Sequence, residues 1–193
     1  MKKKIKSTGV IFGDMHFPLH DESAFSCALK VIEKVKPDIF INLGDFAEGE
    51  YVSHWRWSRR KRPPLEYQLP LIDKEAQEVN MHMDRIDYAL KKVGCKNKYL
   101  AMGNHDNWYN AFVEENPYLD KYKPETLFDI EKRGYKWFPY GEIFKVEDSK
   151  LYAYHGGHYG SVNHSRATVQ NLGCNIIYGH THDCQRSVVQ HIS

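Results

Sequence analysis

The sequence lacks the long apolar runs of a membrane protein and the paired cysteines of a disulfide-rich one. No apolar stretch approaches the roughly 18 residues that cross a bilayer, and the lysines at 2–4 lead into Ser7 and Thr8 rather than into an apolar signal core. The four cysteines form no CxxC pair, and a chain of this length needs no disulfides. We therefore expect a cytoplasmic protein without membrane contact, with reduced thiols and with Cys27 and Cys174 in the core.

An excess of charge of one sign is also missing. Lys and Arg number 27 against 25 Asp and Glu, and a net charge of +2 does not by itself indicate a nucleic-acid partner. A hydrophobic content of 41% excludes a disordered or low-complexity chain. The length of 193 residues, without an internal repeat, predicts one domain over residues 1–193. Histidine is abundant, with 11 residues, and their positions are more informative than their number.

Strands and helices alternate in the first half of the sequence. Lys6–Phe12 and Asp38–Leu43 are predicted as buried strands, and between them Asp21 caps a helix that ends before Pro37. The apolar face of that helix consists of Phe25, Ala28, Leu29, Ile32 and Val35. A strand, a helix and a second strand in this order predict a parallel sheet.

A longer amphipathic helix follows over Ile72–Val93, with apolar residues at alternating spacings of four and three and Gly94 as its end. A coiled coil is the alternative, but three heptads favour a helix on a sheet. Lys98–Met102 is the next predicted strand. The second half is predicted to hold a helix and four strands: Ser161–Leu172, and Ile143–Val146, Leu151–Tyr154, Asn175–Tyr178 and Ser187–Ile192.

The segment at about 49–70 differs in character and is predicted to be an insertion or lid. Trp55 and Trp57 lie among basic residues, and Pro63-Pro64 follows. The arginines of this segment are Arg56, Arg59, Arg60 and Arg62. Cations interleaved with aromatic rings suit a nucleic-acid backbone and unstacked bases, although a solvated loop is the alternative.

Five predicted strands end in residues that ligate metals. Because ligands bind beyond the carboxyl ends of parallel strands, these residues should converge. Their Asp, Asn and His side chains suit Mn²⁺, Fe, Zn²⁺, Co²⁺ or Ni²⁺ better than Ca²⁺, and seven of them exceed the need of one ion. The motifs are Gly13-Asp14-Met15-His16, Gly44-Asp45, Gly103-Asn104-His105-Asp106, His155-Gly156 and Gly179-His180-Thr181-His182.

Each motif alone has an ordinary structural explanation as a turn or a helix cap, and only their joint occurrence favours a metal site. His155 is preferred to His158 as a ligand because it directly follows the strand. His158 and His164 would line a substrate pocket or lie on the surface. The remaining histidines outside the motifs receive no function: His20, His54, His82 and His191.

The five motifs, in this order from Asp14 to His182, resemble the signature of the calcineurin-like metallophosphoesterase superfamily. The resemblance implies an α/β fold, in which a two-sheet β-sandwich is flanked by helices in four αββα layers. It also implies two divalent metal ions, with Mn²⁺ preferred. Asp14, His16, Asp45 and His182 would hold one ion, and Asp45, Asn104, His155 and His180 the other.

The resemblance makes His105 the catalytic histidine, which would protonate the departing alkoxide. Glu48 is the first candidate for the carboxylate that orients His105, at a position where phosphatase relatives carry Asp, and Asp106 is the second. Phosphoprotein phosphatases carry a phosphate-binding Arg where this chain has Gly49, which argues against a protein phosphatase.

We expect a metal-dependent phosphodiesterase or nuclease that acts on a nucleotide or on single-stranded nucleic acid. Its substrate-binding candidates are Arg56, Arg59, Arg60, Arg62 and His158. A phosphomonoesterase of small substrates is one alternative, and a non-catalytic protein-interaction scaffold with the same fold is another. The presence of His105 and of every ligand disfavours the scaffold.

Overall fold

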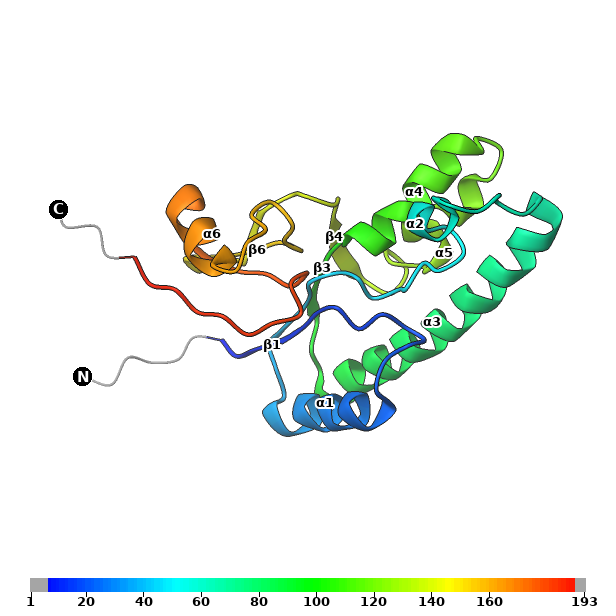
Figure 1. Cartoon of the computed structure of the whole chain (residues 1–193). Coiled ribbons are helices and arrows are strands. Elements are labelled where there is room, and N and C mark those ends of the chain that lie inside the picture. The colour runs from blue at the N-terminus through cyan, green and yellow to red at the C-terminus, as the bar shows by residue number, and fades with distance from the viewer. Residues whose placement is uncertain (1–6, 190–193) are drawn as a thin grey trace, which may run out of the picture.

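The computed structural model describes residues 7–189 and places two β-sheets face to face (Figure 1). The first sheet has the order β1-β2-β3-β4 with all strands parallel, and the second has the order β5-β6-β7. The strands are β1 (Gly9–Phe12), β2 (Ile39–Asn42), β3 (Asn97–Ala101), β4 (Tyr135–Phe138), β5 (Phe144–Lys145), β6 (Leu151–Ala153) and β7 (Asn175–Ile177).

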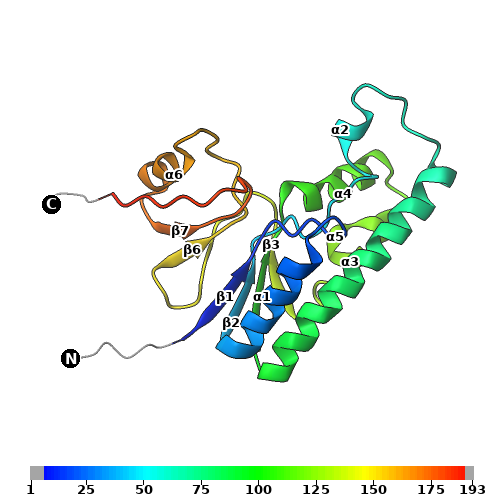
Figure 2. The ribbon, with the colours of Figure 1, turned by 60° about the horizontal axis from the view of Figure 1, so that its bottom comes forward.

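Helices cover the outer face of each sheet. Figure 2 shows α1 and α3 side by side against the first sheet, while α6 covers the second. The helices are α1 (Glu22–Val35), α2 (His54–Trp57), α3 (Leu65–Val93), α4 (Asn104–Glu115), η1 (Asp120–Tyr122), α5 (Pro124–Leu127) and α6 (His164–Leu172). The predicted four-layer αββα arrangement is therefore confirmed.

Strand β2 shows how one sequence supplies two cores. Successive side chains of a strand point to opposite faces, so Phe40 packs among the helices while Ile39 and Ile41 face the second sheet. All four residues of β2 are buried, as expected for a parallel strand covered on both sides. The second sheet contributes Phe144 and Ala153 to the core between the sheets.

The first predicted strand-helix-strand unit is present. Asp21 caps α1 by accepting a hydrogen bond from the Ala24 backbone N–H at 2.8 Å, and Lys36 ends the helix in the left-handed conformation before Pro37. Strands β1 and β2 pair in parallel. The first residue of the predicted strand, Lys6, lies outside the described residues.

Helix α3 begins at Leu65, seven residues before the predicted start at Ile72. It therefore includes the last six residues of the predicted insertion, among them the exposed Pro70. Gln68 is buried and donates a hydrogen bond to the Tyr51 carbonyl at 2.7 Å, which joins the helix to the loop. The sequence pattern placed the residues up to Pro70 in the insertion and therefore predicted a later start, at Ile72.

Two other predictions differ from the structure. Cys27 lies on the exposed side of α1 and Cys174 is half-buried, whereas Cys95 is the buried cysteine, so the first two do not fill the core. Of the predicted strand Ser187–Ile192, residues 187–189 form no regular structure and the rest lie outside the described part. No helix within residues 7–189 has the length and apolarity needed to cross a membrane.

We expect the two methionines of α3 at 81 and 83 to differ in their contribution to stability. Met83 is 0% exposed in the core and Met81 is 53% exposed on the opposite side. Met83→Ala should lower the free energy of unfolding by about 2–5 kcal/mol because it leaves a cavity, and Met81→Ala by less than about 0.5 kcal/mol. Urea unfolding measures both, and equal losses would contradict this assignment of the core.

Candidate metal centre

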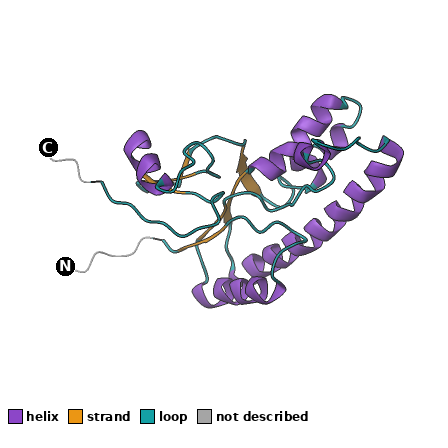
Figure 3. Cartoon of the chain, in the orientation of Figure 1, coloured by secondary structure: helices purple, strands orange, loops and turns teal. Residues whose placement is uncertain are grey.

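The motif loops meet beyond the carboxyl ends of the strands, in the central loop region of Figure 3. Backbone hydrogen bonds hold the loops together: the Asp14 N–H donates to the Gly44 carbonyl at 3.0 Å, and the Gly179 N–H donates to the His155 carbonyl at 2.8 Å. Loops that lie far apart in the sequence thus form one surface, as expected at this edge of a parallel sheet.

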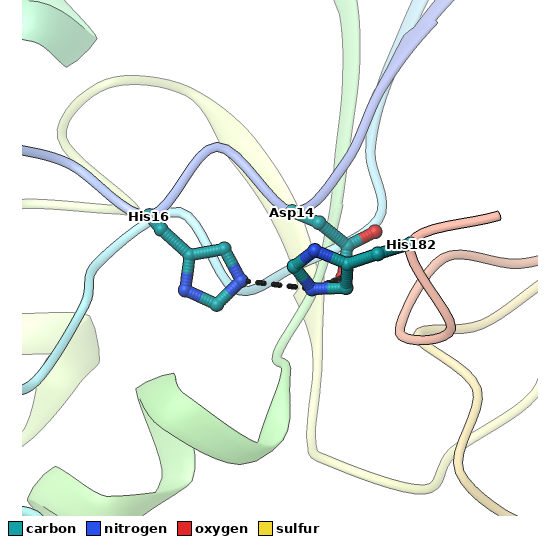
Figure 4. Close-up of side chains that lie close together, drawn as sticks. All are labelled: Asp14, His16 and His182. Atoms are coloured by element: carbon teal, nitrogen blue, oxygen red, sulfur yellow. Dashed lines mark hydrogen bonds and ion pairs between the residues drawn. The ribbon is translucent and has the colours of Figure 1, made fainter. Parts of the chain in front are cut away.

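The structure brings all seven predicted ligands into two neighbouring groups. Asp14, His16 and His182 each offer a ligand atom within 4.8 Å of the others (Figure 4). A second group, with atoms equally close, consists of Asp45, His155 and His180. Asn104 completes it, since its Oδ1 lies 3.0 Å from His155 Nε2 and 2.8 Å from His180 Nδ1. His155, rather than His158, occupies this position.

The environment of His155 fits a cation. Its Nδ1 lies 2.7 Å from the Leu43 carbonyl oxygen, which can only accept, so Nδ1 carries the proton. In the neutral ring the Nε2 lone pair then faces Asn104 Oδ1 at 3.0 Å and Asp45 Oδ2 at 3.3 Å. Three acceptor atoms that face one another repel unless a proton or a metal ion lies between them.

The environment of His16 has the same character. Its Nδ1 donates to Glu48 Oε2 at 2.9 Å, and its Nε2 lies 3.2 Å from His182 Nε2 and 3.9 Å from Asp45 Oδ2. A ligating histidine usually donates its other ring N–H to a carboxylate or a backbone carbonyl, and His16 and His155 each do so. The donor set therefore fits two divalent transition-metal ions, with Asp45 between the groups.

Charge at the site is concentrated enough to shift imidazole pKa values. Burial alone would lower the pKa of His16, but Glu48 and Asp45 raise it above its usual value. Burial opposes Asp45 at His155 in the same way, and the pKa is again raised. At His180 burial dominates and the neighbouring His155 adds to it, so the pKa is lowered. The carboxylates thus create a potential that favours positive charge between the two groups.

Backbone conformation independently marks the same residues. Within residues 7–189, eight non-glycine residues have positive φ, and five of them are predicted ligands. The five are Asp14 (φ 51°), His16 (φ 47°), Asp45 (φ 47°), His180 (φ 72°) and His182 (φ 52°). Such backbone strain costs about 1–3 kcal/mol per residue and concentrates at functional sites, where the surrounding structure enforces it.

The motif glycines leave space for the carboxylates. A Cβ atom at Gly103 would lie 2.0 Å from Asp45 Oδ1, and one at Gly179 would lie 2.2 Å from Asp14 Oδ2. Gly44, with φ +93°, would meet backbone atoms of Ala101 and Gly103 at 2.6 and 2.5 Å. At these positions any side chain would displace a predicted ligand or its loop.

His105 lies beside the first group, and it is held by the backbone of Glu48 rather than by its carboxylate. Its Nδ1 donates to the Glu48 carbonyl oxygen at 2.6 Å, whereas Glu48 Oε2 is 3.8 Å away and bonds to His16 instead. One residue thus orients both histidines through different atoms, which the sequence motif did not indicate.

Asp106 has a different environment from the one predicted for an orienting carboxylate. It is fully buried and accepts backbone N–H bonds from Asp45 and Gly103 at 2.8 Å and from Ala47 at 3.2 Å. Burial and the nearby Asp45 raise its pKa to about 7. The carboxylate therefore joins the loop after β2 to the start of α4 and makes no described contact with the His105 ring.

The predicted substrate-binding residues lie in two places. Arg56 forms an ion pair with Glu50, and Arg62 forms one with Glu115. Arg59 and Arg60 are exposed, with no ion pair to any described residue. His158 lies in the loop after β6, exposed and 5.3 Å from the Tyr154 ring.

The other histidines lie in polar networks of their own. His164 is buried and bonds to the Tyr178 hydroxyl at 2.6 Å and to Asp183 at 2.7 Å. His20 and His82 form a further metal-type group with Glu22. The Arg85 guanidinium already contacts that group, 2.8 Å from Glu22 Oε2 and 3.2 Å from His82 Nδ1, so a cation is present there. His191 lies outside the described residues.

Sequence reasoning missed Glu75, a carboxylate buried on the core side of α3. Its Oε1 accepts the Glu50 N–H at 3.1 Å, so it supports the loop that follows Glu48. Its Oε2 has no hydrogen-bond partner among the described residues. Burial raises the pKa of Glu75 to about 7, and the nearby Glu48 adds to the effect. The available signal was an acidic residue three positions after Ile72 on an apolar stripe.

Comparison with known families agrees with this geometry. The family model described as calcineurin-like phosphoesterase matches residues 10–184. The match covers most of the chain and includes every predicted ligand, so the chain belongs to the calcineurin-like phosphoesterase family, whose members generally use divalent metals. A search of the curated proteins found no match.

We expect Gly103→Ala and Gly179→Ala to weaken Mn²⁺ affinity by about 10- to 100-fold, because the new methyl group displaces Asp45 or Asp14. Gly160→Ala is the matched control, since no atom lies within 4 Å of its added Cβ. Calorimetric titration of folded protein, verified by circular dichroism, gives the affinities. Unchanged affinity in both site variants would exclude Asp14 and Asp45 as ligands.

We expect Glu75→Gln to change the pH dependence of stability. The pKa of Glu75 is raised to about 7 in the folded state, so its ionisation reduces stability as pH rises from the ordinary value near 4.5 towards 7. Gln does not ionise and keeps an acceptor for Glu50. The free energy of unfolding of Glu75→Gln minus that of the wild type should therefore rise by up to about 3 kcal/mol across this pH range and then level off.

Urea unfolding at intervals from pH 4.5 to 8 tests this expectation. Glu66→Gln, at the exposed start of the same helix, is the control and should differ from wild type by less than about 0.5 kcal/mol throughout. A difference between Glu75→Gln and wild type that stays constant with pH would show that Glu75 does not titrate in this range.

Proposed function

We propose that this protein is a metal-dependent phosphodiesterase that hydrolyses a nucleotide or single-stranded nucleic acid with two divalent cations, Mn²⁺ first among them. The observation that carries the proposal is the convergence of seven donor side chains into two groups, with His105 beside them. Membership in a phosphoesterase family supports the reaction class. The four unpaired cysteines support a reducing compartment such as the cytoplasm.

When bound, the two cations would acidify a water molecule and neutralise the phosphoryl oxygens. In the reaction a water molecule loses one proton to solvent and its oxygen forms the new bond to phosphorus, while the bond from phosphorus to the leaving oxygen breaks. Asp45 orients the protonating group, because its Oδ1 accepts the His105 backbone N–H at 2.9 Å. The imidazolium of His105 keeps its Nδ1–H on the Glu48 carbonyl and gives its Nε2 proton to the leaving oxygen.

The residues around His105 support a diester rather than a monoester. Gly49 brings no cation to the position where phosphoprotein phosphatases bind phosphate, and its φ of 66° favours glycine there. Because Arg56 and Arg62 are paired with carboxylates, Arg59 and Arg60 are the arginines of this loop that remain for a polyanionic substrate. In a nucleic-acid substrate, a phosphate next to the one that is cleaved would bind to Arg59 and Arg60, outside the metal centre.

The test is a Mn²⁺-supplemented comparison of a bis-aryl phosphate, a mono-aryl phosphate, cyclic nucleotides, single-stranded DNA and RNA. We expect diesters to be hydrolysed faster than the monoester. His105→Ala should lower kcat by about 10²–10⁴-fold, because the leaving group loses its acid, while Mn²⁺ affinity stays within a few-fold of wild type.

The same comparison decides between the alternatives. Faster turnover of the monoester would identify a phosphomonoesterase. Retention of Mn²⁺ without turnover of any phosphoester would support the non-catalytic scaffold. His182→Ala is the companion variant: it should lose both affinity and turnover, because His182 belongs to the first group of donors.

A further inference from the structure

A continuous run of aromatic rings leads from the centre to the outside of the molecule. The His105 ring lies 4.5 Å from the His16 ring and 3.9 Å from the Trp108 ring. Trp108 meets His54 edge to face at 5.9 Å, and His54 lies 4.5 Å from Trp55. Distances of this size are those of directly interacting aromatic pairs.

The outer rings of this run are exposed although the helix that carries them is fixed. Trp55 is 68% exposed and His54 is exposed beside it. The short helix α2 is anchored to the rest of the protein. Val52 and Ser53, which precede it, are buried, and Trp57 Nε1 donates a hydrogen bond to the Tyr51 carbonyl at 3.4 Å. The structure therefore presents a large aromatic surface to solvent from an anchored segment.

Arg56 contributes to this anchoring. Its guanidinium lies 5.3 Å from the Tyr51 ring centre and 5.4 Å from the Trp57 ring centre, and it pairs with Glu50. Cation–π contacts and an ion pair hold the side chain against the loop. Arg56 thus stabilises α2. This structural role accounts for Arg56, so it need not bind substrate.

We propose that His54 and Trp55, continued by the edge of Trp108, form a stacking subsite for the planar ring of the substrate's leaving group, a nucleobase. This inference rests on the proposed function. His105 donates its proton to the leaving oxygen, so the group attached to that oxygen leaves the centre on the side of His105. The aromatic run begins on that side at Trp108 and ends at the exposed Trp55.

Stacking on an exposed tryptophan binds any base and does not read sequence, because every base offers a π-face. One stacked base strengthens binding by about 5- to 150-fold. The subsite acts on the ground state and the transition state alike, so its loss should raise KM and leave kcat unchanged. This KM-against-kcat pattern separates the subsite from a residue that supports His105.

The experiment compares a thymidine dinucleotide with two analogues in which one sugar or the other lacks its base. Trp55→Ala should raise KM for the dinucleotide by about 10-fold with kcat unchanged. For the analogue whose leaving sugar lacks its base, Trp55→Ala and the wild type should have the same KM. This analogue has the same leaving alkoxide as the dinucleotide but no ring that could stack on Trp55. Trp55→Phe should restore most of the affinity.

Tyr118→Ala is the matched control, because Tyr118 is a fully exposed aromatic residue that is not part of this run. It should leave KM unchanged for all three substrates. Equal changes of KM for the dinucleotide and both analogues in Trp55→Ala, or no change for any of them, would overturn the stacking subsite.

A binding measurement distinguishes failure of the subsite from failure of the proposed function. In equilibrium dialysis against metal-free protein, the dinucleotide should bind more weakly to Trp55→Ala than to the wild type. The analogue whose leaving sugar lacks its base should bind equally to both proteins. If the wild type binds in this base-dependent way but cleaves no diester, the subsite stands and the proposed function fails. If it cleaves diesters with no dependence on the base, the function stands and the subsite is wrong.

Discussion

The contacts of Asp45 join the second donor group to His16 of the first group and to His105. Its carboxylate accepts the His105 N–H and faces the Nε2 atoms of His155 and His16, its own N–H donates to Asp106, and its carbonyl accepts the His16 N–H at 2.9 Å. A side chain with this many partners has one possible position, and that position exists only because Gly103 has no Cβ. This network fixes Asp45 relative to His16, His105 and His155, while a separate hydrogen bond from the His180 N–H joins the last motif to Asp14.

The protein maintains this arrangement at a cost in stability. Three features oppose folding: the left-handed backbone conformation of five predicted ligands, the acceptor atoms that face one another, and the buried carboxylates of Asp106 and Glu75. The cost is offset by a core that lies on both faces of the first sheet and by loops that bond to each other along its edge. A rigid frame around a strained centre is the usual condition for preorganised catalysis.

The sequence predicted the elements that carry strong periodicity and the motif residues at the strand ends, because both follow from local rules. It failed where the deciding fact is tertiary. The start of α3 depends on buried Gln68, the edge strand β4 was not recognised, and Cys27 faces solvent although it is apolar. At the site, residue types and their order were informative, but no pattern shows that Glu48 uses its carbonyl for His105 and its carboxylate for His16.

The last motif contributes to both donor groups, with His182 in one and His180 in the other. The contact between Asp14 and His180 joins residues 166 positions apart, so the two donor groups are complete only after the residues up to His182 have been synthesised. A nascent chain that has not yet emerged to this point can assemble neither group. A divalent ion that binds only the complete groups would add its binding free energy to the stability of the folded protein.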